Sequence, residues 1–140
     1  MSNEIKVTPL DLVGKDERGT TYTYGFKDRQ NFVFITRKAG TVSGNTYHEG
    51  KFTGTNPKTF VILTGQLDFS YRQINDERHT VIRILEPSII EVAPRVVHAV
   101  KAITDITILE CNSLFEIEND RYRMLVECEG SSLTENACGG

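Results

Sequence analysis

Short runs of β-prone residues, separated by turn residues, recur along most of the chain. In residues 66–74 apolar and polar side chains alternate, so Leu67, Phe69 and Tyr71 share one face, which is typical of a half-buried strand. Further strands are expected at residues 7–13, 19–26, 31–37, 41–48, 59–63, 79–85, 89–92, 97–103 and 106–111. This spacing, with almost no helical pattern, predicts an all-β sandwich or barrel.

The 140 residues are expected to form one domain with a single core. We divide the chain into N-terminal strands (1–30), a barrel (31–112), a C-terminal segment that is helical or irregular (113–129) and a polar, disordered tail (130–140).

Composition excludes several classes of function. The net charge of −3, without a basic cluster, gives no reason to expect nucleic-acid binding. No apolar run reaches the length of a membrane span, and the N-terminus lacks the apolar core of a signal peptide. The three cysteines are odd in number and lack CxxC spacing, which favours free thiols and a cytoplasmic location.

Two short stretches carry the motifs of a known superfamily. Gly44, His48 and Gly65 occupy positions of the first cupin motif, which normally has a glycine, two histidines, a glutamate and a closing glycine. Pro94 and His98 occupy positions of the second motif. The chain therefore resembles the cupins, and the resemblance implies a single jelly-roll β-barrel.

The resemblance covers about residues 33–108 and is closest to cupins of bacterial polysaccharide and deoxysugar biosynthesis. GNTYH resembles the RGNHYH of the C-terminal cupin domain in capsular-polysaccharide nucleotide-sugar enzymes, and FSYRQI resembles the FRxRxI strand of that group. Among the related barrels are sugar-nucleotide ketoisomerases and epimerases. The resemblance also implies a homodimer with the N-terminal strands at its interface.

The chain departs from the cupin motif at the metal ligands. Thr46 stands where the first histidine belongs and Lys58 where the glutamate belongs, with nine residues between His48 and Lys58. Threonine is a poor ligand for borderline metals, and a protonated lysine opposes a cation. We therefore expect no metal and no other cofactor. A weak, open metal site at His48 and His98, assisted by Glu49 or Glu110, remains an alternative.

His48, His98 and Lys58 are the candidate catalytic residues. Imidazole titrates near neutral pH, so one histidine can act as a base and the other as an acid, while Lys58 stabilises a developing enolate oxygen. The alternatives are two core histidines of an inactive barrel and an outward-facing lysine on a strand.

Thr46, Tyr71, Arg37 and Arg72 are the candidate substrate-binding residues. Tyr71 is expected to face the barrel interior, where it either contacts a sugar or base, or only packs in the core. The two arginines can hold a diphosphate bidentately, or they can be isolated surface residues.

The sequence favours a small-molecule-binding cupin that acts as a metal-independent isomerase or epimerase on a nucleotide-linked keto sugar. One alternative is a non-catalytic sugar or nucleotide-sugar binding or accessory protein. A second is a metal-dependent cupin with an incomplete histidine site.

Overall fold

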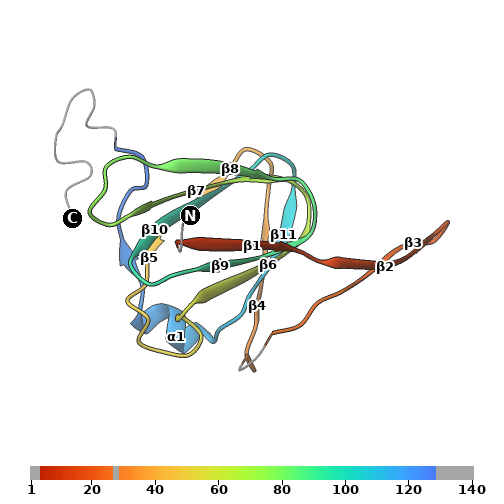
Figure 1. Cartoon of the computed structure of the whole chain (residues 1–140), viewed down its shortest axis with the longest axis horizontal. Helices are drawn as coiled ribbons and strands as arrows, with labels where there is room; N and C mark the ends of the chain where they lie inside the picture. Colours follow the sequence, from red (N-terminus) through yellow and green to blue (C-terminus); the bar gives the residue numbers. More distant parts are fainter. Residues whose placement is uncertain (1–3, 27–28, 129–140) are drawn as a thin grey trace.

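The computed structural model describes residues 4–26 and 29–128, which form a sandwich of two antiparallel five-stranded sheets and a projecting hairpin (Figure 1). The first sheet has the order β1 (Ile5–Pro9), β9 (Ser88–Val92), β6 (Lys58–Thr64), β11 (Ile106–Glu110) and β4 (Val33–Arg37). The second has the order β12 (Tyr122–Arg123), β5 (Val42–Tyr47), β10 (Val96–Ala102), β7 (Leu67–Gln73) and β8 (Thr80–Ile84). The predicted all-β class is confirmed.

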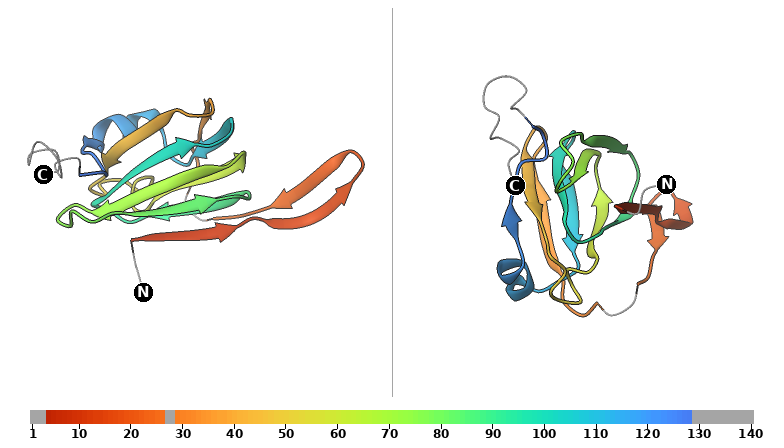
Figure 2. Two further views of the ribbon diagram at one scale, coloured as in Figure 1. Left: turned by 90° about the horizontal axis from the view of Figure 1, so that it is seen from above. Right: turned by 60° about the vertical axis from the view of Figure 1, so that its left-hand side comes forward.

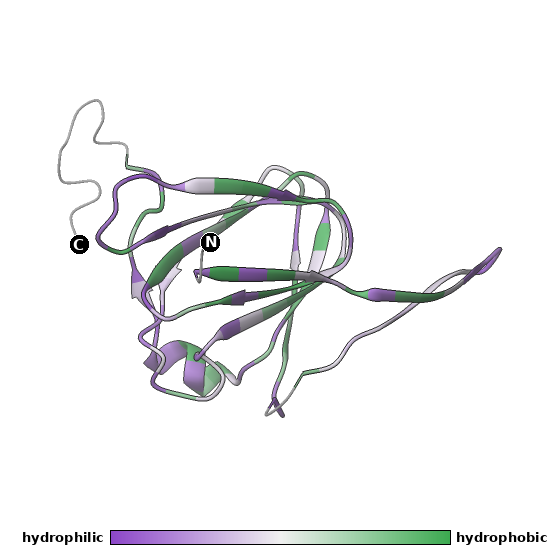
Figure 3. Ribbon diagram, viewed as in Figure 1, coloured by the Kyte–Doolittle hydropathy of each residue, from purple (hydrophilic) through white to green (hydrophobic). Residues whose placement is uncertain are grey.

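The core lies between the two sheets, and the strand alternation that defines it is visible along the ribbons of Figure 3. Leu67 and Phe69 are fully buried and Tyr71 nearly so, as their shared face on β7 predicts. Their cluster also includes Phe60, Ile62, Ile84, Ile90, Val92, Val96, Val100, Ala102, Ile106 and Ile108. This packing fixes the register of the strands that carry the candidate site.

Gly65 forms the turn that joins β6 to β7, where the sequence places a turn glycine. Its φ of +91° is strained for other residues, and a Cβ there would collide with the carbonyl oxygen of Asp105. The turn therefore requires glycine on both conformational and steric grounds.

The single strand expected at residues 7–13 is two strands. β1 is an edge strand of the first sheet, and the chain leaves that sheet at Leu10, whose N–H donates to Pro87 O. β2 (Asp11–Asp16) then pairs with β3 (Gly19–Thr23), and this hairpin extends away from the sandwich (Figures 1 and 2). The sandwich thus includes residues before position 31, where we expected the barrel to begin.

The C-terminal segment contains one short helix, α1 (Leu114–Asn119), as one of the two predicted possibilities. Ser113 caps its N-terminus and forms a reciprocal capping box with Glu116. No helix within 4–26 and 29–128 is long and apolar enough to cross a membrane. The predicted disordered tail, 130–140, lies outside the described residues.

Two cysteines lie among the described residues. Cys111, which directly follows β11, is free and buried in a cluster with Val61 and Ile89. Cys128 is disulfide-bonded, so the expectation of free thiols is wrong for this residue.

Candidate functional site

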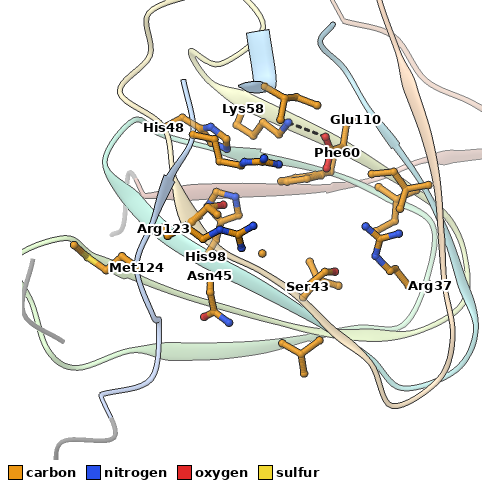
Figure 4. A pocket seen from close by; sticks show the side chains of 18 of the residues that line it. Arg37, Ser43, Asn45, His48, Lys58, Phe60, His98, Glu110, Arg123 and Met124 are labelled. Carbon is orange, nitrogen blue, oxygen red and sulfur yellow. Dashed lines mark hydrogen bonds and ion pairs between the residues drawn. The ribbon is translucent and has the colours of Figure 1, made fainter. Parts of the chain in front are cut away.

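A cavity of about 820 Å³ lies between the sheets near the end that carries α1. It contains five of the seven predicted site residues: Arg37, Thr46, His48, Lys58 and His98. The remaining lining residues are Ile35, Val42, Ser43, Gly44, Asn45, Phe60, Val100, Ile108, Glu110, Ile117, Arg121, Arg123, Met124 and Leu125. Figure 4 shows His48, Lys58 and Glu110 toward one end of this cavity and Arg37 toward another.

His48 and His98 lie side by side, with ring centroids 5.4 Å apart, and both are buried. Nδ1 of His48 donates to Asp120 O over 2.6 Å, and Nδ1 of His98 donates to Val96 O over 3.0 Å. A carbonyl oxygen can only accept, so in each ring Nδ1 carries the proton. Each Nε2 therefore holds a lone pair.

Both imidazoles are neutral at physiological pH. Burial, helped by the charge of Lys58, lowers the pKa of His48 to about 4. Burial, helped by His48, lowers the pKa of His98 to about 3. Because neither Nε2 carries a proton, both histidines can act as bases. We had expected one base and one acid.

Lys58 is the first residue of β6 and is only 2% exposed, so the alternative of an outward-facing strand residue does not hold. Its Nζ donates to Glu110 Oε1 over 3.1 Å and to Asn112 Oδ1 over 2.5 Å, and lies 5.2 Å from the centroid of the Phe60 ring. Burial lowers the pKa of Lys58, while Glu110 acts in the opposite direction. The ammonium is therefore paired but poorly solvated.

The donor set fits a metal ion poorly. Within the described part of the chain, no three His, Cys, Asp or Glu side chains form a group that could hold one. The two glutamates considered as helpers are both engaged elsewhere: Glu110 pairs with Lys58, and Glu49 pairs with Arg95.

Gly44 allows β5 to approach β10 closely. Its φ is +101°, and a Cβ there would lie 3.0 Å from Ala99 Cα and from His98 O. The pairing of β5 with β10 shifts register between His98 and Ala99, and Thr46 lies directly opposite His98. This close pairing sets buried Thr46 beside the histidines.

Asp120 organises the histidine end of the cavity, and the sequence analysis missed it. Its main-chain oxygen accepts the His48 Nδ1 proton. Its fully buried carboxylate accepts the N–H groups of Glu49, Gly50 and Lys51 and the hydroxyl of Thr55. One residue therefore orients the imidazole and fixes the loop that follows it.

Three arginines line the cavity. Arg37 was predicted, whereas Arg121 and Arg123 lie in the segment that we expected only to be helical or irregular. Arg123 is placed by β12, which pairs with β5 so that Arg123 lies opposite Thr46. Among the described residues, the cavity lining thus combines three guanidinium groups and one ammonium with a single carboxylate, that of Glu110.

The other two predicted binding residues lie outside the cavity lining. Tyr71 belongs to the apolar core beside Phe69, with ring centroids 6.3 Å apart. Arg72 is buried and donates to five main-chain oxygens, those of Gln73, Ile74, Asp76, Leu125 and Val126. It therefore braces the C-terminal segment instead of facing a ligand.

The fold is similar to that of several solved nucleotide-sugar enzymes. The sugar 3,4-ketoisomerase QdtA from Thermoanaerobacterium thermosaccharolyticum, in complex with TDP, is 15% identical with a TM-score of 0.68, over 88% of this chain and 90% of QdtA. The dTDP-6-deoxy-D-glucose-3,5-epimerase RmlC from Legionella pneumophila, in complex with dTDP-4-keto-L-rhamnose, is 12% identical with a TM-score of 0.67, over 89% of this chain and 74% of RmlC.

The capsular polysaccharide assembling protein CapF from Staphylococcus aureus is 21% identical with a TM-score of 0.59, over 84% of this chain and 33% of CapF. No protein-family model matches the sequence. No curated protein sequence matches it either. The resemblance seen in the motifs is confirmed at the level of the fold: this chain folds like the solved ketoisomerase QdtA and the solved epimerase RmlC.

Proposed function

We propose that this protein is a metal-independent isomerase or epimerase of a nucleotide-linked keto sugar. The observation that carries the proposal is a cavity holding two neutral imidazoles, each with an available Nε2 lone pair, together with the ammonium of Lys58. Removing a proton from a carbon beside a carbonyl needs a base and a positive group near the developing enolate oxygen. His48 or His98 supplies the base, and Lys58 supplies the charge.

The arginines support a nucleotide-linked substrate. Arg37, Arg121 and Arg123 give the cavity an excess of positive charge, and guanidinium groups bind phosphate oxygens bidentately. The solved neighbours QdtA and RmlC hold TDP and a dTDP-linked keto sugar. By analogy we assign a nucleoside diphosphate to the arginines and the sugar to the histidine end, beside Thr46.

A non-catalytic nucleotide-sugar binding protein is the second candidate. The same three arginines favour it, since binding a diphosphate does not require a proton donor. The two candidates differ in turnover and not in binding, which makes them separable in one set of assays.

The test substrate is dTDP-4-keto-6-deoxyglucose, which is the ligand in the structure of a QdtA variant. We expect NMR to detect an isomerised or epimerised product, and calorimetry to detect dTDP binding. Arg37→Ala should weaken dTDP binding about 10- to 100-fold, whereas Arg83→Ala, which removes a partly exposed pair with Asp68, should not. Binding without turnover favours the second candidate. The absence of both binding and turnover refutes both candidates.

We also propose a homodimer, in which the projecting hairpin contributes to the interface. Leu12 and Val13 on this hairpin are 53% and 61% exposed, and a partner would cover them. Sedimentation equilibrium tests this, and a monomer at micromolar concentration contradicts it.

We also propose a cytoplasmic location. Because disulfides persist mainly in oxidising compartments, measuring whether Cys128 is oxidised in cells tests this proposal.

A further inference from the structure

We propose that Lys58 is a proton carrier, which moves a proton between two neighbouring oxygens of the sugar, and that Glu110 and Asn112 hold its Nζ in place for this task. The inference rests on the proposed function and deepens it. There, Lys58 serves only as a positive charge, whereas here its proton is transferred and recovered in each turnover.

The cavity offers few other groups that can give and take a proton at oxygen. The Nδ1 proton of each histidine is used by a carbonyl oxygen, and each Nε2 is a lone pair. The three arginines remain protonated at any relevant pH. The hydroxyls of Ser43 and Thr46 are too weakly acidic to protonate an enolate without help. Glu110, as the partner of an ammonium, is an acceptor.

The contacts of Lys58 match the role of a carrier. An ammonium has three N–H groups, and two of them point to Glu110 Oε1 and Asn112 Oδ1. Within the described residues these are its hydrogen-bond partners, so the third N–H can face a ligand. Burial favours release of the proton, and Glu110 limits that release before the substrate is present.

For a keto sugar with a hydroxyl on the adjacent carbon, the protons balance. The Nε2 of one histidine removes the hydrogen of the hydroxyl-bearing carbon, and that electron pair forms a C=C bond while the carbonyl pair moves onto its oxygen. Lys58 protonates this oxygen, which gives an enediol and a neutral amine.

The amine then takes the proton of the second hydroxyl, whose electron pair forms the new carbonyl. The C=C pair accepts a proton from the imidazolium at the former carbonyl carbon. One carbon is oxidised and its neighbour reduced, and both side chains return to their starting states without a co-reactant.

The test compares two rates in deuterated water with the 4-keto sugar nucleotide: exchange of the carbon-bound hydrogen, and migration of the carbonyl. Lys58→Arg keeps the charge but cannot release a proton. We expect it to retain exchange while the ratio of migration to exchange falls at least about 100-fold, in the range of general acid–base catalysis. The ratio does not depend on how much of the variant folds.

Glu110→Gln provides a second variant, in which Nζ loses its ionised acceptor. We expect the same ratio to fall at least about tenfold, at the low end of such catalytic effects. Lys101→Arg, a change of an exposed lysine on β10, is the matched control and should leave the ratio unchanged.

An unchanged ratio in both Lys58→Arg and Glu110→Gln overturns the inference and leaves the proposed function intact. Exchange without migration in the wild-type protein also overturns it, because that result describes an epimerase. Absence of both exchange and migration in the wild type refutes the proposed isomerase itself.

Discussion

Replacing Asp120 by asparagine should destabilise the protein by about 2–4 kcal/mol. Oδ2 of Asp120 accepts from the N–H groups of Gly50 and Lys51 and from the Thr55 hydroxyl, while Oδ1 accepts from the N–H of Glu49. The amide of asparagine can keep its oxygen facing the three donors, but its NH₂ then faces the fourth. The lost bond and the unmet donor cost about 1–3 kcal/mol. Weakening of the other three bonds from charged to neutral adds about 1 kcal/mol.

Urea unfolding at pH 7, followed by circular dichroism, measures this difference. Asp16→Asn is the control, because that carboxylate is 44% exposed and paired with exposed Arg18, so its loss should lower the free energy of unfolding much less than Asp120→Asn does. Because the main-chain oxygen that accepts from His48 is kept in Asp120→Asn, the variant isolates the contribution of the side chain. An Asp120→Asn variant no less stable than Asp16→Asn would refute the reasoning.

The pH dependence of this effect provides an independent check. Burial alone raises the pKa of the Asp120 carboxyl, but its N–H and hydroxyl donors outweigh burial and hold that pKa below its ordinary value. The stabilisation is therefore fully present above the unfolded pKa of about 3.9 and is lost as pH falls through the folded pKa. The stability gap between wild type and Asp120→Asn should be constant from pH 7 to 5 and should narrow in stronger acid.

Two further predictions concern stability. The folded pKa values of His48 and His98 are about 4 and about 3, whereas an unfolded histidine has a pKa of about 6.5. Between these values the unfolded chain gains protons that the folded protein does not, so the free energy of unfolding falls as pH decreases. From pH 7 to 5.5 the two histidines should remove about 2–3 kcal/mol from the free energy of unfolding measured by urea titration, and replacing both by asparagine should flatten this slope. Gly44→Ala should cost more than about 1 kcal/mol by thermal unfolding, because its φ is positive and its Cβ would press on the β10 backbone. Gly14→Ala, whose Cβ meets no atom within 4 Å, is the control, and equal losses would contradict the close approach.

Most of the strands could be predicted because their two faces differ in polarity. The alternation in β7 is sharp, so its inward residues Leu67 and Phe69 were identified correctly. The break at Leu10 was missed because residues on both sides of it form strands. Pairing with the distant strand β9 assigns β1 to the first sheet, whereas β2 pairs with its neighbour β3. Local pattern identifies a strand but not its partner.

One of the two arginines of the predicted diphosphate site was misplaced, although the alternation in β7 already argued against it. Arg37 lines the cavity. Arg72 follows Tyr71 on β7, so it faces the opposite side of the second sheet, where the chain of Leu125 and Val126 covers it. The alternation rule that placed Tyr71 in the core thus also excluded Arg72 from the interior.

Part of the site has no sequence signal. Asp120 lies 72 residues from His48 along the chain and holds it through a main-chain oxygen, which any residue type could provide. Arg121 and Arg123 reach the cavity because a two-residue strand, β12, joins the edge of the second sheet. Neither contact follows from a motif, since both depend on the path of the chain after α1.

The most direct test of the central claim is hydrogen exchange at the carbon beside the carbonyl. The purified, metal-free protein is incubated with dTDP-4-keto-6-deoxyglucose in deuterated water and the sugar is examined by NMR. Wild type should incorporate deuterium well above the rate without protein, and His48→Asn and His98→Asn should each reduce that rate at least about 100-fold while dTDP still binds. Background incorporation by the wild type, or full incorporation by both variants, would contradict the account.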